Sequence, residues 1–268
     1  MYVSAHRGVR HHLIADEGPR SALDWELLLQ PEGRSGAENM AIDQALLEEA
    51  DRSGRAVLRL YRWDPPCLSI GRNEPALTRY DRAAIARLGL DIVRRPTGGR
   101  AVWHEHEVTY AVAAPIVAFG SLRQSYYWIH ERLAAALRAL GVEATLASDH
   151  PTARPPDRQG PCFASLVGGE ILAAGRKVIG SAQVRQGAAF LQHGSILLDG
   201  SQETVRAVSR QPSAIRGEIT LAAVLGRTVS FEEVTEAVVA AWDGGGRFTR
   251  RDAPSVRPSA DDAWTWRR

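Results

Sequence analysis

The stretch at residues 94–113 constrains the fold more than any other part of the sequence. An apolar strand that ends near Val93 runs into two arginines, and the Gly98-Gly99 pair then allows the backbone to turn without a Cβ in the way. Apolar residues alternate again from Val102 onward, which predicts a return strand or a pair of strands. The fold must therefore hold a glycine loop between strands.

The glycine loop carries a concentration of positive charge, from Arg94, Arg95 and Arg100. Exposed backbone amides beside cationic side chains are suited to an anionic ligand. A glycine pair between strands is also typical of a plain hairpin turn. On these residues alone, a loop that binds an anionic ligand and a structural turn remain equally compatible with the sequence.

The rest of the chain mixes strands and helices without strict alternation, which predicts an α+β class with a mixed, largely antiparallel sheet packed with helices. Strands are predicted at 25–29, 57–63, 67–70, 92–95, 144–147, 170–173, 177–183 and 190–198. Helices are predicted at 35–50, 81–88, 121–140, 203–208, 221–225 and 231–242, two of them behind capping-box pairs.

The composition excludes several classes of partner. A net charge of +2 on 268 residues is too balanced to indicate a nucleic-acid partner, and the apolar runs are too short to predict a membrane partner. Two cysteines cannot build a disulfide scaffold, so we expect a cytoplasmic protein. A monomer is the default expectation for its oligomeric state. Residues 1–22 are expected to form a disordered arm and 244–268 a tail that is disordered apart from any docking by Trp264 and Trp266, with a catalytic domain at 23–243.

Lys177 is the only lysine among the 33 basic residues. A compact ammonium differs from the planar guanidinium of arginine in geometry and hydration. In a chain that otherwise uses arginine, we interpret this lysine as a functional residue rather than a chance survivor.

Cys162 is the candidate nucleophile, since it follows a Pro- and Arg-rich loop and precedes an aromatic residue. A reactive thiolate needs a nearby cation or imidazole, for which Lys177 and His193 are candidates. Cys67 lies within an apolar strand and is predicted to be a buried core residue.

The histidines allow two interpretations. His104 and His106 are spaced as neighbours on one strand face, which could bind a metal, but no third ligand follows at suitable spacing, so no metal site is expected. His193 precedes a Gly-Ser pair in a strand and could line a site or lie satisfied in the core.

Three motifs in a fixed order resemble the lipoate–protein ligase A superfamily, which also contains biotin ligases and octanoyltransferases. The motifs are residues 38–43 (Glu-Asn-Met-Ala-Ile-Asp), residues 94–104 (Arg-Arg-Pro-Thr-Gly-Gly-Arg-Ala-Val-Trp-His), and residues 175–183 (Gly-Arg-Lys-Val-Ile-Gly-Ser-Ala-Gln) followed by His193-Gly194-Ser195. The resemblance covers residues 25–199.

The resemblance implies the lipoate ligase and biotin ligase catalytic-domain fold, with a tunnel for a medium-length acyl chain and no metal or other cofactor. It also implies that Lys177 is catalytic and contacts the acyl carbonyl or a carrier phosphate. The substrate-binding residues that it implies are Arg94, Arg95, Thr97, Gly98, Gly99, Arg100, Ala101, His104, Gly180, Ser181, Ala182, His193 and Gly194.

Within the superfamily, the chain resembles the cysteine-dependent octanoyltransferases most, because Cys162 lies just upstream of the Lys177 motif. The implied reaction moves an octanoyl group from acyl carrier protein to Cys162 as a thioester, and then to a lysine of a lipoyl domain or glycine-cleavage H protein. Two alternatives remain open: an ATP-dependent lipoate or octanoate ligase, and a noncatalytic protein that binds lipoyl domains.

Overall fold

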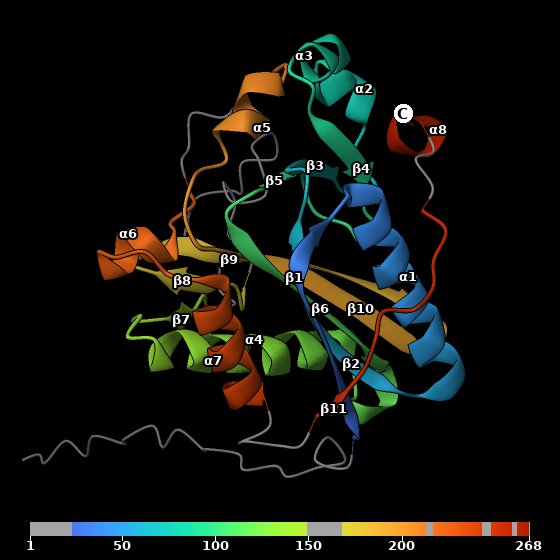
Figure 1. Cartoon of the computed structure of the whole chain (residues 1–268), viewed down its shortest axis with the longest axis vertical. Helices are drawn as coiled ribbons and strands as arrows, with labels where there is room; N and C mark the ends of the chain where they lie inside the picture. Colours follow the sequence, from blue (N-terminus) through green and yellow to red (C-terminus); the bar gives the residue numbers. More distant parts are fainter. Residues whose placement is uncertain (1–22, 149–167, 213–216, 243–247, 259–261, 268) are drawn as a thin grey trace, which may run out of the picture.

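The computed structural model describes residues 23–148, 168–212, 217–242, 248–258 and 262–267. It contains an eight-stranded sheet and a smaller three-stranded sheet beside it (Figure 1). The large sheet has the order β11-β1-β2-β6-β10-β9-β8-β7. Its strands are β1 (Trp25–Arg34), β2 (Ala56–Trp63), β6 (Glu107–Pro115), β7 (Thr145–Leu146), β8 (Ile171–Ala173), β9 (Arg176–Gln186), β10 (Ala189–Leu197) and β11 (Thr249–Arg250).

The small sheet, in the order β4-β3-β5, consists of β3 (Cys67–Ile70), β4 (Asp91–Arg94) and β5 (Val102–His104). In the large sheet, β1 runs parallel to both β2 and β11, and the other ladders are antiparallel. The predicted α+β class with a mixed, largely antiparallel sheet is confirmed.

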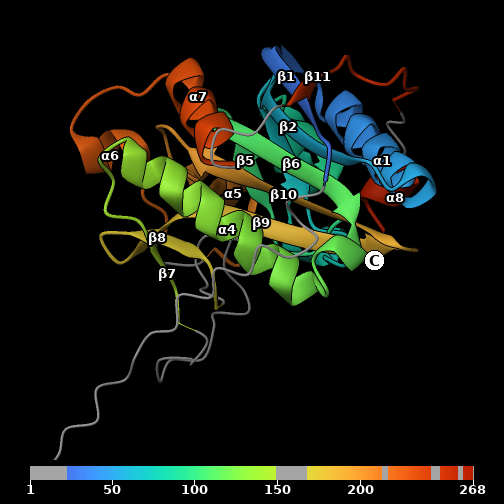
Figure 2. The same ribbon diagram turned by 90° about the horizontal axis from the view of Figure 1, so that it is seen from below.

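Helices cover both faces of the large sheet (Figure 2). Alternate residues of β2 explain this arrangement, since successive side chains of a strand point to opposite faces. Leu58 and Leu60 pack with α4 (Leu122–Ala139) and α7 (Phe231–Trp242), whereas Val57 and Tyr61 pack with α1 (Gly36–Ser53). Two apolar cores therefore hold one sheet, and the small sheet lies next to the α1 core.

The ends of α1 and α4 follow the predicted capping signals. Ser35 and Glu38 form both hydrogen bonds of a capping box, and α1 ends at Gly54 in the left-handed conformation. The hydroxyl of Ser121 accepts from the backbone N–H of Gln124 and so caps α4. The remaining helices are α2 (Ala76–Arg79), α3 (Arg82–Arg87), α5 (Glu203–Val208), α6 (Leu221–Leu225) and α8 (Asp262–Thr265).

The structure differs from the predicted disordered tail at 248–258 and 262–267. There β11 pairs with the first strand, at Glu26 with Thr249 and Leu27 with Arg250. Just after α8, the Trp266 side chain is buried in the apolar cluster that also contains Leu68 and Ile70 of β3. Tertiary contacts order these short segments, and their sequence carries little propensity of its own. The predicted arm at 1–22 lies outside the described residues.

None of the helices in these described ranges is long and apolar enough to cross a membrane.

Candidate functional site

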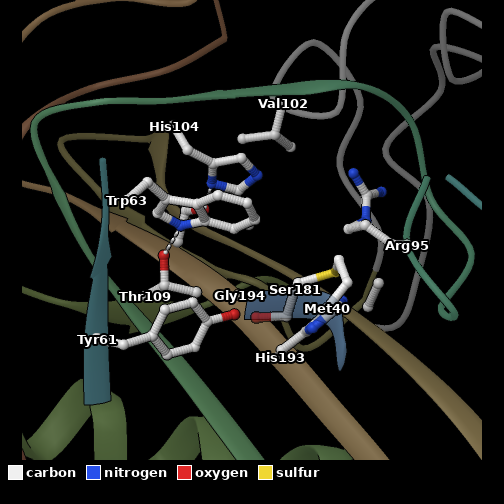
Figure 3. Close-up of a pocket in the computed structure, with 13 residues that line it drawn as sticks. Met40, Tyr61, Trp63, Arg95, Val102, His104, Thr109, Ser181, His193 and Gly194 are labelled. Atoms are coloured by element: carbon white, nitrogen blue, oxygen red, sulfur yellow. Dashed lines mark hydrogen bonds between the residues drawn. The ribbon is translucent and has the colours of Figure 1, made fainter. Parts of the chain in front are cut away.

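A narrow cavity lies between the large sheet and the small sheet, and its outline takes in about 330 Å³ of space, open solvent included (Figure 3). Met40 of α1, Trp63 of β2 and Val102 of β5 give it apolar walls. The full lining is Met40, Tyr61, Trp63, Arg95, Val102, His104, Thr109, Gly180, Ser181, Ala182, His193, Gly194 and Ser195.

Glycine at position 194 lets neighbouring groups come close to the backbone of β10. A Cβ at Gly194 would lie 2.3 Å from the carbonyl oxygen of Gly180 and 2.8 Å from both Ser181 Oγ and a ring carbon of Tyr110. These distances are too short for any side chain, so the close packing of Tyr110 and Ser181 against β10 requires glycine.

Arg95 organises the glycine loop from inside. Its guanidinium donates to the carbonyl and hydroxyl oxygens of Ser69, and to the carbonyl oxygens of Gly98 and Arg100, at 2.7–3.0 Å. Arg95 is also buried, so its charge is compensated by loop carbonyls around the cavity rather than by solvent. The sequence interpreted Arg95 as part of a cationic loop that faces a ligand. The structure shows that its guanidinium also stabilises the conformation of the loop.

The glycine loop packs closely against its neighbours. Gly99 has φ of +84°, which favours glycine, and a Cβ there would lie 3.6 Å from the Cβ of Ala182 on β9. Gly71, just after β3, approaches the loop so closely that a Cβ would lie 2.0 Å from the carbonyl oxygen of Gly99. The loop therefore closes the cavity over β9.

His193 links the glycine loop to α1. Its Nδ1 lies 2.8 Å from Asp43 Oδ2 and its Nε2 lies 2.6 Å from Thr97 Oγ1. A carboxylate only accepts, so Nδ1 carries the hydrogen and the Thr97 hydroxyl donates to Nε2. Burial lowers the pKa of His193 and the nearby carboxylate only partly offsets this, so the ring is neutral at pH 7.

Asp43 is the centre of a buried polar cluster on the α1 side of the sheet. Burial alone would raise its pKa, but Arg59 and His193 outweigh burial and lower it. Arg59 Nη1 donates to Asp43 Oδ1 at 2.7 Å, and Tyr61 Oη donates to Oδ2 at 3.0 Å. All of these groups are fully or almost fully buried, so this cluster fixes how β2, β10 and α1 meet.

His104 sits in a similar arrangement on the other wall of the cavity. Its Nδ1 lies 2.7 Å from Glu107 Oε1 and its Nε2 lies 2.6 Å from Ser69 Oγ, while its ring stacks on Trp63 with centroids 4.0 Å apart. The prediction that His104 and His106 share one strand face is wrong. β5 ends at His104, and His106 lies in the turn before β6 with its side chain exposed.

Lys177 lies away from this cavity, inside the protein at the start of β9. It is 1% exposed, and its ammonium nitrogen lies 2.5 Å from Glu170 Oε1. A second, wider cavity opens nearby and is lined by Arg123, Tyr126, Tyr127, Gly168, Glu170, Ser181, Ala182 and Gln183. Ser181 and Ala182 line both cavities.

Ser181 also contacts a third buried histidine. His130 of α4 lies 2.8 Å from Ser181 Oγ through Nε2, and 2.6 Å from the carbonyl oxygen of Gly169 through Nδ1. Burial is the main cause that lowers the pKa of His130 to about 4, and Lys177 lowers it further, whereas the bond to Gly169 opposes the shift. All three buried histidines thus have a hydroxyl at Nε2 and an acceptor at Nδ1.

The structure brings together part of the predicted set. Seven of the predicted residues line the narrow cavity: Arg95, His104, Gly180, Ser181, Ala182, His193 and Gly194. Thr97 and Gly99 contact this group through His193 and Ala182. Gly98 is open on its Cβ side, and Arg100 is half-buried at the end of the loop.

Besides Lys177, two predicted residues point elsewhere, and one lies outside the described residues. Arg94 is buried and donates to the carbonyl oxygens of Gly71, Glu74, Trp264 and Thr265, which ties α8 to β4. Ala101 is packed in the apolar core of the small sheet. Cys162, the predicted nucleophile, falls in the segment 149–167, which lies outside the described residues.

The sequence prediction missed several lining and supporting residues. Those in the cavity wall are Met40, Tyr61, Trp63, Val102, Thr109 and Ser195, and those behind it are Asp43, Glu107 and His130. Asp43 lies in the first quoted motif, four residues after Asn39. Residues at this spacing share one face of a helix, so its inward position could have been predicted. His130 follows Tyr126 by four positions in the predicted helix 121–140, so its place on the same helix face as that aromatic residue was a signal.

A family model described as the lipoyl protein ligase A/B catalytic domain matches residues 35–243. Among curated relatives, octanoyltransferase LipM of Carboxydothermus hydrogenoformans is 45% identical over 168 residues, which are 61% of this chain and 61% of that one. Octanoyltransferase LipM of Kyrpidia tusciae is 41% identical over 239 residues, 80% of this chain and 84% of that one.

Among solved structures, lipoate-protein ligase A bound with ATP has a TM-score of 0.70 at 22% identity. The match covers 85% of this chain and 90% of that one. At this identity the likeness establishes the shared fold.

Proposed function

Because the chain belongs to the lipoyl protein ligase A/B catalytic domain family and is an acyltransferase, we propose that it transfers an octanoyl group through a thioester on Cys162. The donor is octanoyl-acyl carrier protein. The acceptor is a lysine of a lipoyl domain or of the glycine-cleavage H protein.

The observation that carries the proposal is the state of the other cysteine. The chain has two cysteines, and Cys67 is fully buried in β3. Burial, with the Asp91 carboxylate beside it, raises the pKa of Cys67 well above its ordinary value. A buried thiol held in its protonated form is a poor nucleophile. We therefore assign the thioester to Cys162, the other cysteine of the chain.

The narrow cavity supports an acyl substrate. Its apolar walls suit a hydrocarbon chain, which gains free energy as its surface leaves water. Ser181 and Ala182 line both this cavity and the wider one, and we propose that the carbonyl end of the chain lies beside them. Asp43 and His130 behind the walls are hydrogen-bonded, whereas the buried Oε2 of Glu107 has no hydrogen-bond partner among the described residues.

The reaction consists of two acyl transfers. In the first, the thiolate of Cys162 attacks the carrier thioester, an S–C bond forms, and the carrier thiolate leaves. In the second, the acceptor amine attacks the new thioester and the thiolate of Cys162 leaves. Two carriers need not occupy the site together, which is the advantage of a covalent intermediate. The assignment of the oxyanion contact to Lys177 stays a prediction, because its ammonium is buried and paired with Glu170 and lies outside both cavity linings.

Intact-protein mass spectrometry tests this proposal. The enzyme is mixed with octanoyl-acyl carrier protein and no ATP, and the expected result is a gain of one octanoyl group that hydroxylamine removes. Cys162→Ala should lose the gain, whereas Cys67→Ala should keep it. A gain in Cys162→Ala equal to that of the wild type would contradict the proposal.

The same experiment separates the alternatives. Acylation of a lipoyl domain only when octanoate and ATP are supplied would identify a ligase in which Cys162 has no covalent role. Binding of a lipoyl domain without turnover under either condition would identify a noncatalytic binding protein.

A further inference from the structure

Arg94 is a buried cation, 2% exposed, at the end of β4 and beside α8 (Figure 1). Successive side chains of a strand point to opposite faces, so Arg95 reaches the glycine loop whereas Arg94 reaches the turn after β3 and α8. The Arg94 guanidinium donates, at 2.7–3.4 Å, to the carbonyl oxygens of Gly71, Arg72, Glu74, Trp264, Thr265 and Arg267. It therefore joins the turn at residues 71–74 to residues 262–267, the α8 segment.

The α8 segment is too short to be stable by itself. α8 has four residues, fewer than an isolated helix needs in water, and the last carbonyl groups of a helix have no donor within it. Arg94 supplies that donor, and the Trp266 side chain is an apolar anchor in the core of the small sheet. The pair of Asp262 with Arg82 is exposed and adds little. Arg94 and Trp266 therefore contribute most to holding the segment in place.

The turn at residues 71–74 contacts the α8 segment on one side and the glycine loop on the other. The carbonyl oxygen of Arg72 accepts from the guanidinium groups of Arg94 and Arg267. The backbone N–H of Arg72 donates to the carbonyl oxygen of Thr97 at 2.8 Å. Arg72 is thus bonded to both segments through its main chain.

Thr97 carries this contact into the cavity wall. Its carbonyl oxygen accepts from Arg72, and its hydroxyl donates to His193 Nε2 at 2.6 Å. His193 lines the narrow cavity, and its other ring nitrogen donates to Asp43. Hydrogen bonds therefore run without a break from the α8 segment to an imidazole of the cavity wall.

Docking of the α8 segment is the weakest part of this path. Short segments with few buried contacts open at a fraction of the free energy of global unfolding. On release, Arg94 loses its three acceptors in the segment, and the carbonyl oxygen of Arg72 loses the Arg267 donor. The turn at residues 71–74 then has fewer bonds that hold it against the glycine loop.

We propose that Arg94 and the α8 segment position the glycine loop: the docked segment holds Arg72 against Thr97 and so keeps the narrow cavity in the shape that binds the acyl substrate. This role rests on the proposed function. Arg94 is a positioning residue, which acts through Arg72 and Thr97 without touching the substrate. A protein whose competent form is only partly populated binds more weakly by that fraction, so release of the segment raises KM and leaves kcat almost unchanged.

Two variants of the full chain test the proposal. Trp266→Ala removes the apolar anchor, and Trp266→Phe restores an aromatic one. Arg94→Lys keeps the charge but loses the planar fork that serves both segments. Phe231→Ala is the matched control, because it also deletes a buried aromatic ring, but in the core on the α4 and α7 side of the large sheet. All are measured at a temperature at which each is folded.

The first measurement needs no substrate. Hydrogen exchange follows the Arg72 amide, and ¹⁵N NMR follows Nε2 of His193, since both bond to Thr97. In Trp266→Ala and Arg94→Lys the Arg72 amide should exchange about tenfold faster, a usual size for coupling between two sites. The Nε2 signal should move toward that of an imidazole without a donor. Trp266→Phe should return both values to those of the wild type, and Phe231→Ala should leave them unchanged.

The second measurement is kinetic. KM for octanoyl-acyl carrier protein should rise about tenfold in Trp266→Ala and Arg94→Lys, with kcat within about twofold of the wild type. An Arg72 amide that exchanges within about twofold of the wild-type rate in both variants would overturn the proposal. Equal changes in Phe231→Ala would also overturn it, because loss of stability alone would then account for them.

A failure of the proposed function gives a different result. A wild type that acylates lipoyl domains only with octanoate and ATP would exclude the thioester donor. Exchange of the Arg72 amide and the His193 signal do not depend on the donor, so they still decide whether the α8 segment positions the loop. KM for octanoate in the presence of ATP then replaces KM for octanoyl-acyl carrier protein.

Discussion

Asp43 shows how much of this site depends on single buried side chains. It contacts Arg59, Tyr61 and His193, which come from two strands, while it stands on α1. Through His193 it also positions Thr97 of the glycine loop. The Asp43 carboxylate therefore neutralises the buried charge of Arg59 and also orients the imidazole of His193 in the cavity wall.

Replacing Asp43 with Asn should destabilise the protein by about 3–5 kcal/mol, because the Arg59 charge would be left buried without a counter-ion. The free energy of unfolding in urea measures this. Asp262→Asn is the control, since the Asp262 pair with Arg82 is exposed and its loss should cost less than about 1 kcal/mol. Equal losses in the two variants would contradict the prediction.

Some residues of the site were predictable from sequence and others were not. The core position of Cys67 followed from its apolar strand and is confirmed, and the resemblance named both histidines and both glycines that line the cavity. The partner of a buried polar residue is invisible in sequence, because it comes from a distant segment. Asp43 and His193 lie 150 positions apart, and His130 and Ser181 lie 51 apart.

At the scale of elements, the glycine loop depends on contact with the residue after β3. Gly71 and Gly99 approach so closely that the two segments form one backbone layer over the cavity. Arg95 then connects the same two segments through carbonyl oxygens. The loop is thus built as part of the small sheet.

Gly71→Ala should force the loop away from β3 and lower stability by about 1–3 kcal/mol, since its Cβ would overlap the carbonyl oxygen of Gly99. Gly98→Ala is the matched change, because a Cβ there meets no atom within 4 Å, and its effect should stay within about 0.5 kcal/mol. Thermal unfolding and hydrogen exchange of the loop amides check both. Equal behaviour of the two variants would show that the loop does not rely on this contact.

The accuracy of the element predictions depended on how local their signals are. Helices α5, α6 and α7 and strand β3 have the predicted bounds, because caps and apolar periodicity lie within the elements themselves. α2, α8 and β11 were missed. Each has four residues or fewer, and β11 exists only as a partner of β1. Such pairing is determined by the tertiary fold.

For the whole molecule, the buried His130 and His193 make stability depend on pH. His130 is neutral when folded, with a pKa of about 4, and has an ordinary pKa near 6.5 when unfolded. Between these values the unfolded chain binds the extra proton, so stability falls as the pH falls. His193 adds to this in the same direction, since its pKa is also lowered.

We therefore expect the free energy of unfolding to drop by about 3 kcal/mol from His130 alone as the pH falls from 6.5 to 4. His130→Gln should show a shallower pH dependence over this interval, measured by urea unfolding at a series of pH values. A slope as steep as that of the wild type would mean that other groups carry the acid sensitivity.

The pairing of β1 with β11 has a consequence for synthesis on the ribosome. β11 is made roughly 220 residues after β1, a delay of roughly 10–45 s at about 5–20 residues per second. Until then the groups of β1 that bond to residues 249–251, such as the carbonyl oxygen of Leu27, have no strand partner. An unpaired strand edge is a template for other strands, so the nascent chain is most open to wrong association at its first strand.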